Sequence, residues 1–374
     1  MKTNKLKAAV GILAVYAAAS GSPACAWKSA PFLAHTNIMQ AALDRVDKSE
    51  YPDLAAFKVK LVEGSNDESW HTMDSPNGGK PEEIWLGAKT ETAGGVLGNY
   101  AAFDFEHAYR RIGSICHLTQ DQAAPPHAAN VQHGLMDRFE TAAGDYSSSL
   151  YTVPADAGAK EPYAYYQETQ DDTRRHLSSW VNPETHRPYW VEDPDSGVKL
   201  GQDSTFGVYG SYGSGEHSFP ITHSDSRILA IVDGQFQSAA RATYKVLISA
   251  SKRLPPLVSD LSAVNTGGGI GISFNAGDNR SRTIKYQVEA YQGSQLLGLI
   301  KEGNLDLSQP GAYGLPLGGS VSLVWDGTVQ GRKLPGGSYA VQVKLTDSDN
   351  NTTPYGVNMD KSRINSTKID VSIN

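Results

Sequence analysis

The spacing of apolar residues changes once along this chain, close to residue 254. Before that point apolar residues recur every three or four positions, most clearly over 32–46, 103–119 and 228–249, which predicts amphipathic helices. After it the period becomes two, which predicts short strands separated by Gly, Asn and Asp turns. The expected strands are 270–274, 284–291, 296–300, 321–325, 339–345 and 369–373, with 257–264 as a candidate seventh.

The chain therefore divides into two domains, as its 374 residues also suggest. Pro255-Pro256 follows Lys252-Arg253, a basic helix end, and marks the boundary. We expect a multidomain protein with an all-α domain over 27–254, followed by an all-β sandwich over 255–374.

The first 26 residues have the composition of a signal peptide. Three lysines precede the apolar run 8–19, and Ala24-Cys25-Ala26 resembles a cleavage site. The run is much shorter than the roughly 20 apolar residues of a membrane span, and no later segment is long enough. A lipoprotein cut before Cys25 is the alternative, although Ser22-Pro23-Ala24 is a poor lead-in. We expect a mature chain that begins at Trp27 and is secreted or periplasmic.

Charge and cysteine content limit the classes of function and the covalent cross-links that we expect. The formal net charge is −7 and becomes more negative when the three leader lysines are removed, which argues against tight nucleic-acid binding through a basic surface. Only Cys116 remains after cleavage, so no intramolecular disulfide is expected. Because neighbours on a helix point about 100° apart, Cys116 should face the core rather than a metal bound by His117.

Histidine and aspartate gather in one short stretch. His117 with Asp121, and His133 with Asp137, are spaced i,i+4, so each pair shares a helix face, and His127 lies between them. Imidazole with carboxylate is a donor set that zinc prefers. An isolated pair would more often be a surface pair, but this density in a chain of ten histidines favours a metal site.

Further candidates extend this series toward the N-terminus. In chain order it comprises Trp27, His35, Asp53, His71, His117, Asp121, His127, His133 and Asp137. With the string His-Leu-Thr-Gln-Asp at 117–121 and a Pro-Pro-His at 125–127, the series resembles the zinc-dependent phospholipase C family, which shares a trinuclear site with the S1/P1 nucleases. The resemblance covers about residues 27–140 by motif and extends to about 252 by helical pattern.

This resemblance implies three zinc ions per chain. One would be held by Asp53, His71, His117 and Asp121, and a second by the Trp27 terminus, His35 and a bridging Asp121. The third would take His127, His133 and Asp137. Zinc would lower the pKa of a bound water and neutralise charge on the phosphoryl oxygens. Asp53 would be the general base, or only a ligand.

The substrate implied is a phospholipid at a membrane or micelle surface, cleaved on the glycerol side of the phosphodiester. Tyr51-Pro52-Asp53-Leu54 and the lack of disulfides favour this interpretation. Asp137 favours the nuclease branch, where Asp replaces the usual Glu, so a zinc nuclease on single-stranded nucleic acid is the alternative. A non-catalytic, zinc-stabilised surface-binding protein is the third hypothesis.

The C-terminal half carries a separate motif. Val324-Trp325-Asp326-Gly327, followed by Pro335-Gly336-Gly337-Ser338-Tyr339, resembles the immunoglobulin-like module related to the flagellar hook-capping protein, which implies an accessory domain of unknown partner. Residues 347–350, Asp-Ser-Asp-Asn, could bind calcium, but a solvated turn is the better interpretation.

His107 and the aromatic residues of 146–212 lie outside the ligand series. His107 should have a structural or surface role, since it lies about 80° around the helix from His117. The aromatic stretch 146–212 could line a headgroup pocket or meet lipid, or it could be an ordinary packed loop.

Overall fold

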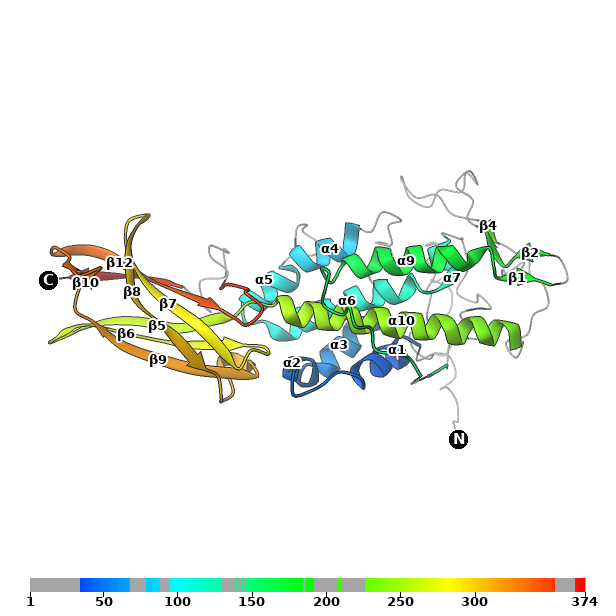
Figure 1. Cartoon of the computed structure of the whole chain (residues 1–374), viewed down its shortest axis with the longest axis horizontal. Helices are drawn as coiled ribbons and strands as arrows, with labels where there is room; N and C mark the ends of the chain where they lie inside the picture. Colours follow the sequence, from blue (N-terminus) through cyan, green and yellow to red (C-terminus); the bar gives the residue numbers. More distant parts are fainter. Residues whose placement is uncertain are drawn as a thin grey trace, which may run out of the picture.

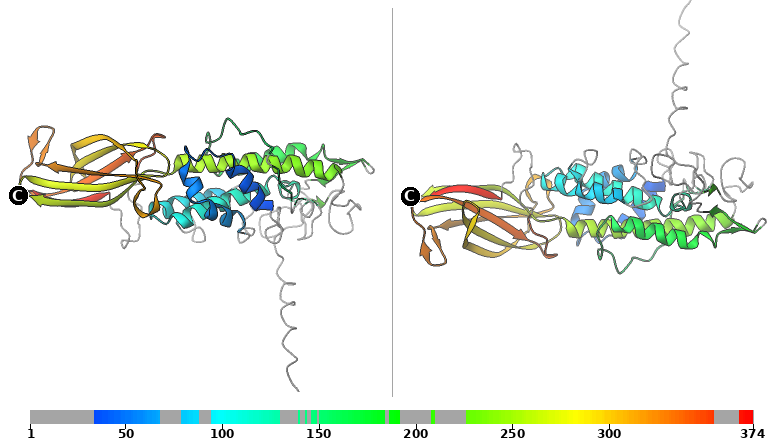
Figure 2. Two further views of the ribbon diagram at one scale, coloured as in Figure 1. Left: turned by 90° about the horizontal axis from the view of Figure 1, so that it is seen from below. Right: turned by 90° about the horizontal axis from the view of Figure 1, so that it is seen from above.

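The chain forms an elongated molecule, with helices in one half and strands in the other (Figure 1). The computed structural model describes residues 34–67, 79–87, 94–129, 139, 143, 146–148, 150–183, 186–191, 208–209, 226–353 and 367–373. Views from below and above show the same end-to-end arrangement (Figure 2).

The helical half is built around two long helices that lie side by side. They are α6, Phe105–Asp121, and α10, Ser226–Arg253. The shorter helices are α1 Ala34–Leu43, α2 Pro52–Ala56, α3 Lys58–Ser65, α4 Gly79–Leu86, α5 Gly95–Ala101, α7 Pro125–Ala128 and α9 Ala164–Leu177. The helices predicted at 32–46, 103–119 and 228–249 are confirmed in α1, α6 and α10.

Helix α6 is the centre of this half. Asp104 caps its N-terminus by accepting the amide of His107 at 3.4 Å, which satisfies one of the free amides of the first turn. From Ile112 to Asp121 every residue is buried, because other helices cover all sides of this stretch. His107 is exposed and contacts Asp104, so its predicted structural role is confirmed.

Helices α3 and α6 approach each other closely at two glycines. A Cβ atom on Gly64 would lie 1.9 Å from the carbonyl oxygen of Arg110, and one on Gly113 would lie 2.3 Å from that of Leu61. Only glycine permits backbones at this distance. The contact fixes the end of α3 against the middle of α6.

The strand half contains most of the β structure. Its long strands are β5 Leu257–Thr266, β6 Gly269–Asp278, β7 Thr283–Gln292, β8 Gln295–Asp306, β9 Leu317–Trp325, β12 Gly337–Thr346 and β13 Lys368–Ile373; β10 Thr328–Val329 and β11 Arg332–Lys333 form a small hairpin. All seven predicted strands are confirmed, each with longer bounds.

These strands form antiparallel sheets in the orders β13-β12-β7-β8, β5-β6-β9 and β10-β11. In the second sheet Phe274 pairs with Val321, and in the first Val343 pairs with Val288. Alternate residues of the large sheets enter one apolar core that includes all four of these side chains. Trp325 lies in the same core and donates from Nε1 to the carbonyl of Thr328 at 2.9 Å.

The expected fold class, an all-α domain followed by an immunoglobulin-like sandwich, is wrong. The described residues are mixed, 41% helical and 30% strand, and three antiparallel sheets occupy the C-terminal region. The helical half also contains two strand pairs, β1 Val181–Asn182 with β2 Arg187–Pro188, and β3 Trp190–Val191 with β4 Val208–Tyr209. Two-residue strands are too short to show an apolar period, so the sequence contained no indication of these pairs.

The aromatic stretch contributes mainly to the interior. Among its described residues Tyr151, Tyr165, Tyr166, Tyr189 and Trp190 are buried. Tyr189 and Trp190 join the core of α1 and α10, and Trp190 packs edge-on against Phe139. These side chains have the role of an ordinary packed segment and do not face a lipid surface.

The two halves meet through polar side chains as well as apolar ones. α10 ends at Arg253 and β5 begins at Leu257, so the predicted boundary at 254 falls in the short connection. Leu257 and Leu315 nevertheless belong to the core of the helical half. The apolar core therefore crosses the boundary.

The acidic turn at 347–350 is solvated in part: Ser348 and Asn350 are exposed, as expected, but Asp347 is buried. Asp347 is only 7% exposed, and it accepts the backbone amides of Asp349 and Asn351 at 2.8 Å each. The Asn351 side chain also donates to the carbonyl of Lys252, at the end of α10. The Asp347 carboxylate therefore holds the backbone of its own turn, and Asn351 joins that turn to the helical half.

Within the described ranges no helix combines the length and apolar character that crossing a bilayer requires.

Candidate metal centre

Three buried side chains come together between α1 and α6. His35 comes from the first turn of α1, while His117 and Asp121 come from the last turns of α6. One ligand atom from each lies within 4.8 Å of the others, and all three side chains are fully buried. In the described part of the chain this is the one group of three or more such residues that could hold a metal ion.

The carboxylate of Asp121 faces both imidazoles. Its Oδ1 lies 3.5 Å from Nε2 of His35, and its Oδ2 lies 3.4 Å from Nε2 of His117. The two rings lie close together, with centroids 4.2 Å apart and planes inclined by 32°. Each carboxylate oxygen therefore has its own imidazole neighbour.

The other ring nitrogens hold the two histidines in place. Nδ1 of His117 donates to the carbonyl oxygen of Ser65 at 2.9 Å. Nδ1 of His35 lies 2.6 Å from Oε1 of Gln120 and donates a hydrogen bond to it. A carbonyl partner on Nδ1 leaves the Nε2 lone pair for a metal, which is how most metal-bound histidines are oriented.

Gln120 is itself held by α10. Its Nε2 donates to the hydroxyl of Thr243 at 3.0 Å, so the amide oxygen is turned toward His35. A chain of two hydrogen bonds thus runs from α10 through α6 to the histidine of α1. All three side chains are fully buried, which restricts their rotation.

The composition of this group suits a cation. A buried carboxylate has a large desolvation cost unless a positive charge compensates it. Two imidazole nitrogens with one carboxylate form a donor set typical of zinc, and a divalent ion among them would provide the charge. The group therefore fits a metal ion by its chemistry, its burial and its hydrogen-bonded second nitrogens.

Asp53, the expected zinc ligand and general base, lies outside this group. Its Oδ2 accepts from Tyr109 at 2.8 Å and from Asn279 at 2.9 Å, and its Oδ1 accepts from Ser251 at 2.9 Å. Tyr109 precedes His117 by eight residues on α6, roughly 12 Å along the helix axis. Asp53 joins the two halves of the molecule instead of facing the histidines.

Burial raises the pKa of Asp53 above its usual value, although hydrogen bonds from Asn279, Tyr109 and Ser251 oppose this shift. Such a carboxylate is held by three donors from three segments of the chain. This arrangement is typical of a structural carboxylate.

Among the remaining expected ligands that the structure describes, none forms a second group. His127 lies on α7, half-buried, and is not part of the His35 group. Arg174 of α9 anchors this short helix by donating to the carbonyl of Ala128 at 2.6 Å. Trp27, His71, His133 and Asp137 lie outside the described residues.

The sequence did not reveal the residues that orient the histidines. Gln120 stands inside the recognised string, but its contact with Thr243 joins positions 123 residues apart. Ser65 contributes only its backbone carbonyl, which every residue has, so the sequence could not single out this position. The prediction for Cys116 is confirmed, since its thiol lies in the apolar core and burial raises its pKa.

No protein-family model matches this chain, and no curated protein matches it. The function is therefore inferred from the residues and the geometry given above.

Proposed function

We propose that the protein is an exported zinc-dependent phosphodiesterase of the phospholipase C type, acting on phospholipids. The observation that carries this proposal is the buried group of His35, His117 and Asp121, whose imidazoles have their Nδ1 atoms bound and their Nε2 atoms facing one carboxylate. A purely structural polar cluster has no need for both rings to share this orientation.

In this proposal the chain supplies ligands and orientation. His35 and His117 each direct Nε2 inward, while Asp121 offers one oxygen on each side and so suits a bridging position. Zinc held there supplies an acidified water and neutralises charge on a phosphoryl group. Asp53 receives no catalytic role, because its oxygens are occupied by Tyr109, Ser251 and Asn279.

Three zinc ions per chain remain part of the proposal. The resemblance assigns the Trp27 terminus and His71 to the same pair of ions as His35, His117 and Asp121. It assigns His127, His133 and Asp137 to a third. A ligand formed by the Trp27 amino group requires removal of residues 1–26, which is why we propose an exported enzyme.

The test combines zinc quantification with a substrate pair. We expect the mature protein to release phosphocholine from a lecithin emulsion and no nucleotides from single-stranded DNA. His117→Ala should abolish zinc-dependent release, whereas His107→Ala, on the exposed side of the same helix, should leave it unchanged. Nucleotide release without phosphocholine release would establish the nuclease alternative, which the identity of Asp137 favours.

A third outcome separates catalysis from structure. Bound zinc with neither activity would support a zinc-stabilised surface-binding protein. A protein that retains one extra residue before Trp27 should lose zinc, and normal zinc content in that protein would contradict the N-terminal ligand.

A further inference from the structure

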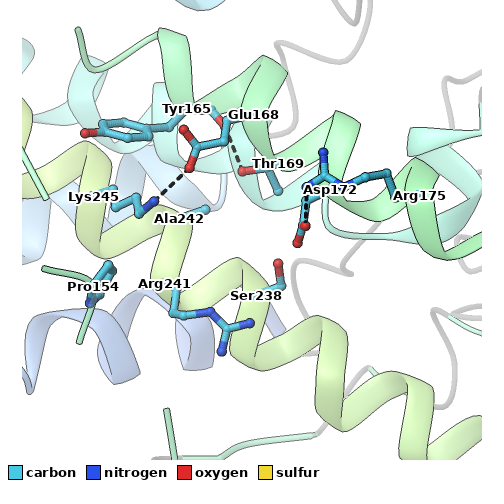
Figure 3. A pocket seen from close by; sticks show the side chains of 10 residues that line it. All are labelled: Pro154, Tyr165, Glu168, Thr169, Asp172, Arg175, Ser238, Arg241, Ala242 and Lys245. Atoms are coloured by element: carbon cyan, nitrogen blue, oxygen red, sulfur yellow. Dashed lines mark hydrogen bonds and ion pairs between the residues drawn. The ribbon is translucent and has the colours of Figure 1, made fainter. Parts of the chain in front are cut away.

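A charged hollow lies between α9 and α10, on the outside of the helical half (Figure 3). Its volume is about 250 Å³, enough for a small ligand. One wall is a face of α9 and the other a face of α10, with Pro154 at the edge. The residues of the α10 wall are Ser238, Arg241, Ala242 and Lys245.

Most charges around this hollow are already paired. Lys245 lies 2.7 Å from Glu168 and 2.7 Å from Asp156, and Glu168 also pairs with Lys160. Arg175 lies 2.6 Å from Asp172 on the same helix. Burial raises the pKa of Glu168, but hydrogen bonds from Lys160 and Lys245 outweigh it, so the pKa lies below its usual value.

Arg241 differs from these cations. In the part of the chain that the structure describes, no carboxylate lies within ion-pair distance of its guanidinium, and in Figure 3 no dashed line joins it to another of the side chains drawn. Ser238, one turn earlier on α10, points its hydroxyl toward the same space (Figure 3). The pairs above cancel one another, so Arg241 makes the wall positive in a chain whose formal net charge is −7.

We infer that this hollow is a binding site for a small soluble phosphate-class anion, with Arg241 as the main contact and Ser238 as a second donor. A planar guanidinium donates two parallel hydrogen bonds to two oxygens of one anion. A serine hydroxyl one helical turn away donates to a third oxygen, and a tetrahedral anion offers such an oxygen where a carboxylate does not.

The surrounding ion pairs make the site selective. The paired carboxylates of Glu168 and Asp172 leave no free cation among the described residues on the α9 side of the hollow for an anion to contact, so the ligand binds on the Arg241 side. The Lys245 ammonium, held over the Tyr165 ring at 5.5 Å from its centroid, is fixed by two carboxylates and leaves Arg241 as the contact.

This site is separate from the proposed metal centre. Thr243, which reaches Gln120 beside His35, lies on a different face of α10 from Arg241 and Lys245, because residues two apart on a helix point about 200° apart. Phosphate binding at the hollow therefore does not depend on the metal ligands, and the two can be measured independently.

The experiment is a calorimetric titration of the metal-loaded full chain with inorganic phosphate at constant ionic strength. Zinc content is measured first, since phosphate also binds zinc. We expect saturable binding that Arg241→Gln weakens at least tenfold. Arg241→Lys, which keeps the charge but not the two parallel guanidinium donors, should weaken the binding less. Arg332→Gln is the matched control, because Arg332 is an exposed arginine of the distant hairpin β10-β11.

Equal phosphate affinity in Arg241→Gln and wild type would overturn the inference. So would acetate binding as tightly as phosphate, because acetate has no third oxygen to accept a hydrogen bond from Ser238. Vesicles of phosphatidic acid are the last probe: Arg241-dependent binding to vesicles, with no binding of inorganic phosphate, would show a lipid site instead of a soluble ligand. Weaker phosphate binding in Ser238→Ala would support the second donor.

Discussion

The carbonyl oxygen of Ser65 accepts a hydrogen bond from Nδ1 of His117 at 2.9 Å, and this contact exists because two helices touch at their glycines. Gly64 directly precedes Ser65, and Gly113 lies one turn before His117. The distance between the backbones of α3 and α6 thus determines the orientation of an imidazole at the proposed metal centre.

Gly113→Ala tests this relationship. A Cβ there would lie 2.3 Å from the carbonyl of Leu61, so the helices must move apart. We expect a loss of about 1–3 kcal/mol in the free energy of unfolding, as for an overpacked core, together with a lower zinc content. Urea unfolding and metal analysis measure both.

Gly234→Ala provides the comparison, since it lies in α10 with nothing within 4 Å of the added methyl. There we expect a gain of up to ~1 kcal/mol from helix propensity. Unchanged zinc content in a destabilised Gly113→Ala protein would separate the helix contact from the metal site.

Gln120→Met removes the acceptor for Nδ1 of His35 while keeping a side chain of similar size. Loss of such a partner reduces metal affinity by roughly 10–100-fold, and we expect a loss in this range from competition with a chelator. Gln237→Met is the control, because Gln237 lies on α10 and bonds only to Asp233 among the contacts described. Equal zinc affinity in both variants would remove Gln120 from the site.

Removing the metal should destabilise the protein. A bound ion that has no affinity for the unfolded chain raises stability with its concentration, so a chelator should lower the melting temperature and added zinc should restore it. In Asp121→Asn we expect this response to disappear, since the carboxylate that faces both imidazoles is gone. Calorimetric scans at several zinc concentrations measure the response, and one that persists in the variant would place the stabilising ion elsewhere.

Asp278 gives a pH dependence of known sign. Burial raises its pKa from 3.8 to about 7, with Asp347 and Asp53 adding to the shift. The folded state therefore favours the protonated acid, and the stability this contributes at low pH is lost as the pH rises from about 4 to about 7.

Asp278→Asn keeps an oxygen for the amides of Arg280 and Ser281 but cannot ionise. We expect the variant to gain stability relative to wild type as the pH rises through this interval. The exposed Asp370→Asn should show no such trend. Urea midpoints across the pH range measure the difference, and parallel curves for wild type and Asp278→Asn would contradict the assignment.

Asn279→Ala tests the link between the halves. The Asn279 amide donates to Asp53, to the hydroxyl of Ser251 and to its carbonyl, and all of these groups are buried. Leaving a buried carboxylate with one donor fewer costs about 1–3 kcal/mol. Asn275→Ala in β6, four residues earlier, where the side chain bonds to Asp260 and Ser320 at the surface, should change the free energy of unfolding by less than ~0.5 kcal/mol.

The sequence predicted most of the long elements, because their apolar periods extend over many residues, but it missed α9, Ala164–Leu177, which lies within the aromatic stretch 146–212. α1, α6, α10 and the seven long strands were all expected. It failed for β1 to β4, each two residues long, and therefore for the fold class. A pattern needs several repeats before it indicates a period, and these pairs depend on tertiary contacts.

The same distinction applies to the metal centre. His35, His117 and Asp121 were found because metal donors are few and their spacing on α6 is visible. Asp53 was assigned from its motif alone, and nothing in that motif shows that Ser251 and Asn279 would occupy its oxygens. Residue type reveals a donor, whereas its partner depends on how distant segments pack.

The position of Asp53 restricts how this protein can have been assembled from parts. Its acceptor oxygens belong to the helical half and its Asn279 donor to the strand half, so neither half has a complete interface alone. Exchange of the C-terminal half for another sheet would leave a buried carboxylate short of a donor unless the replacement supplied an equivalent amide. Recombination at residue 254 is therefore constrained by a chemical match at this contact.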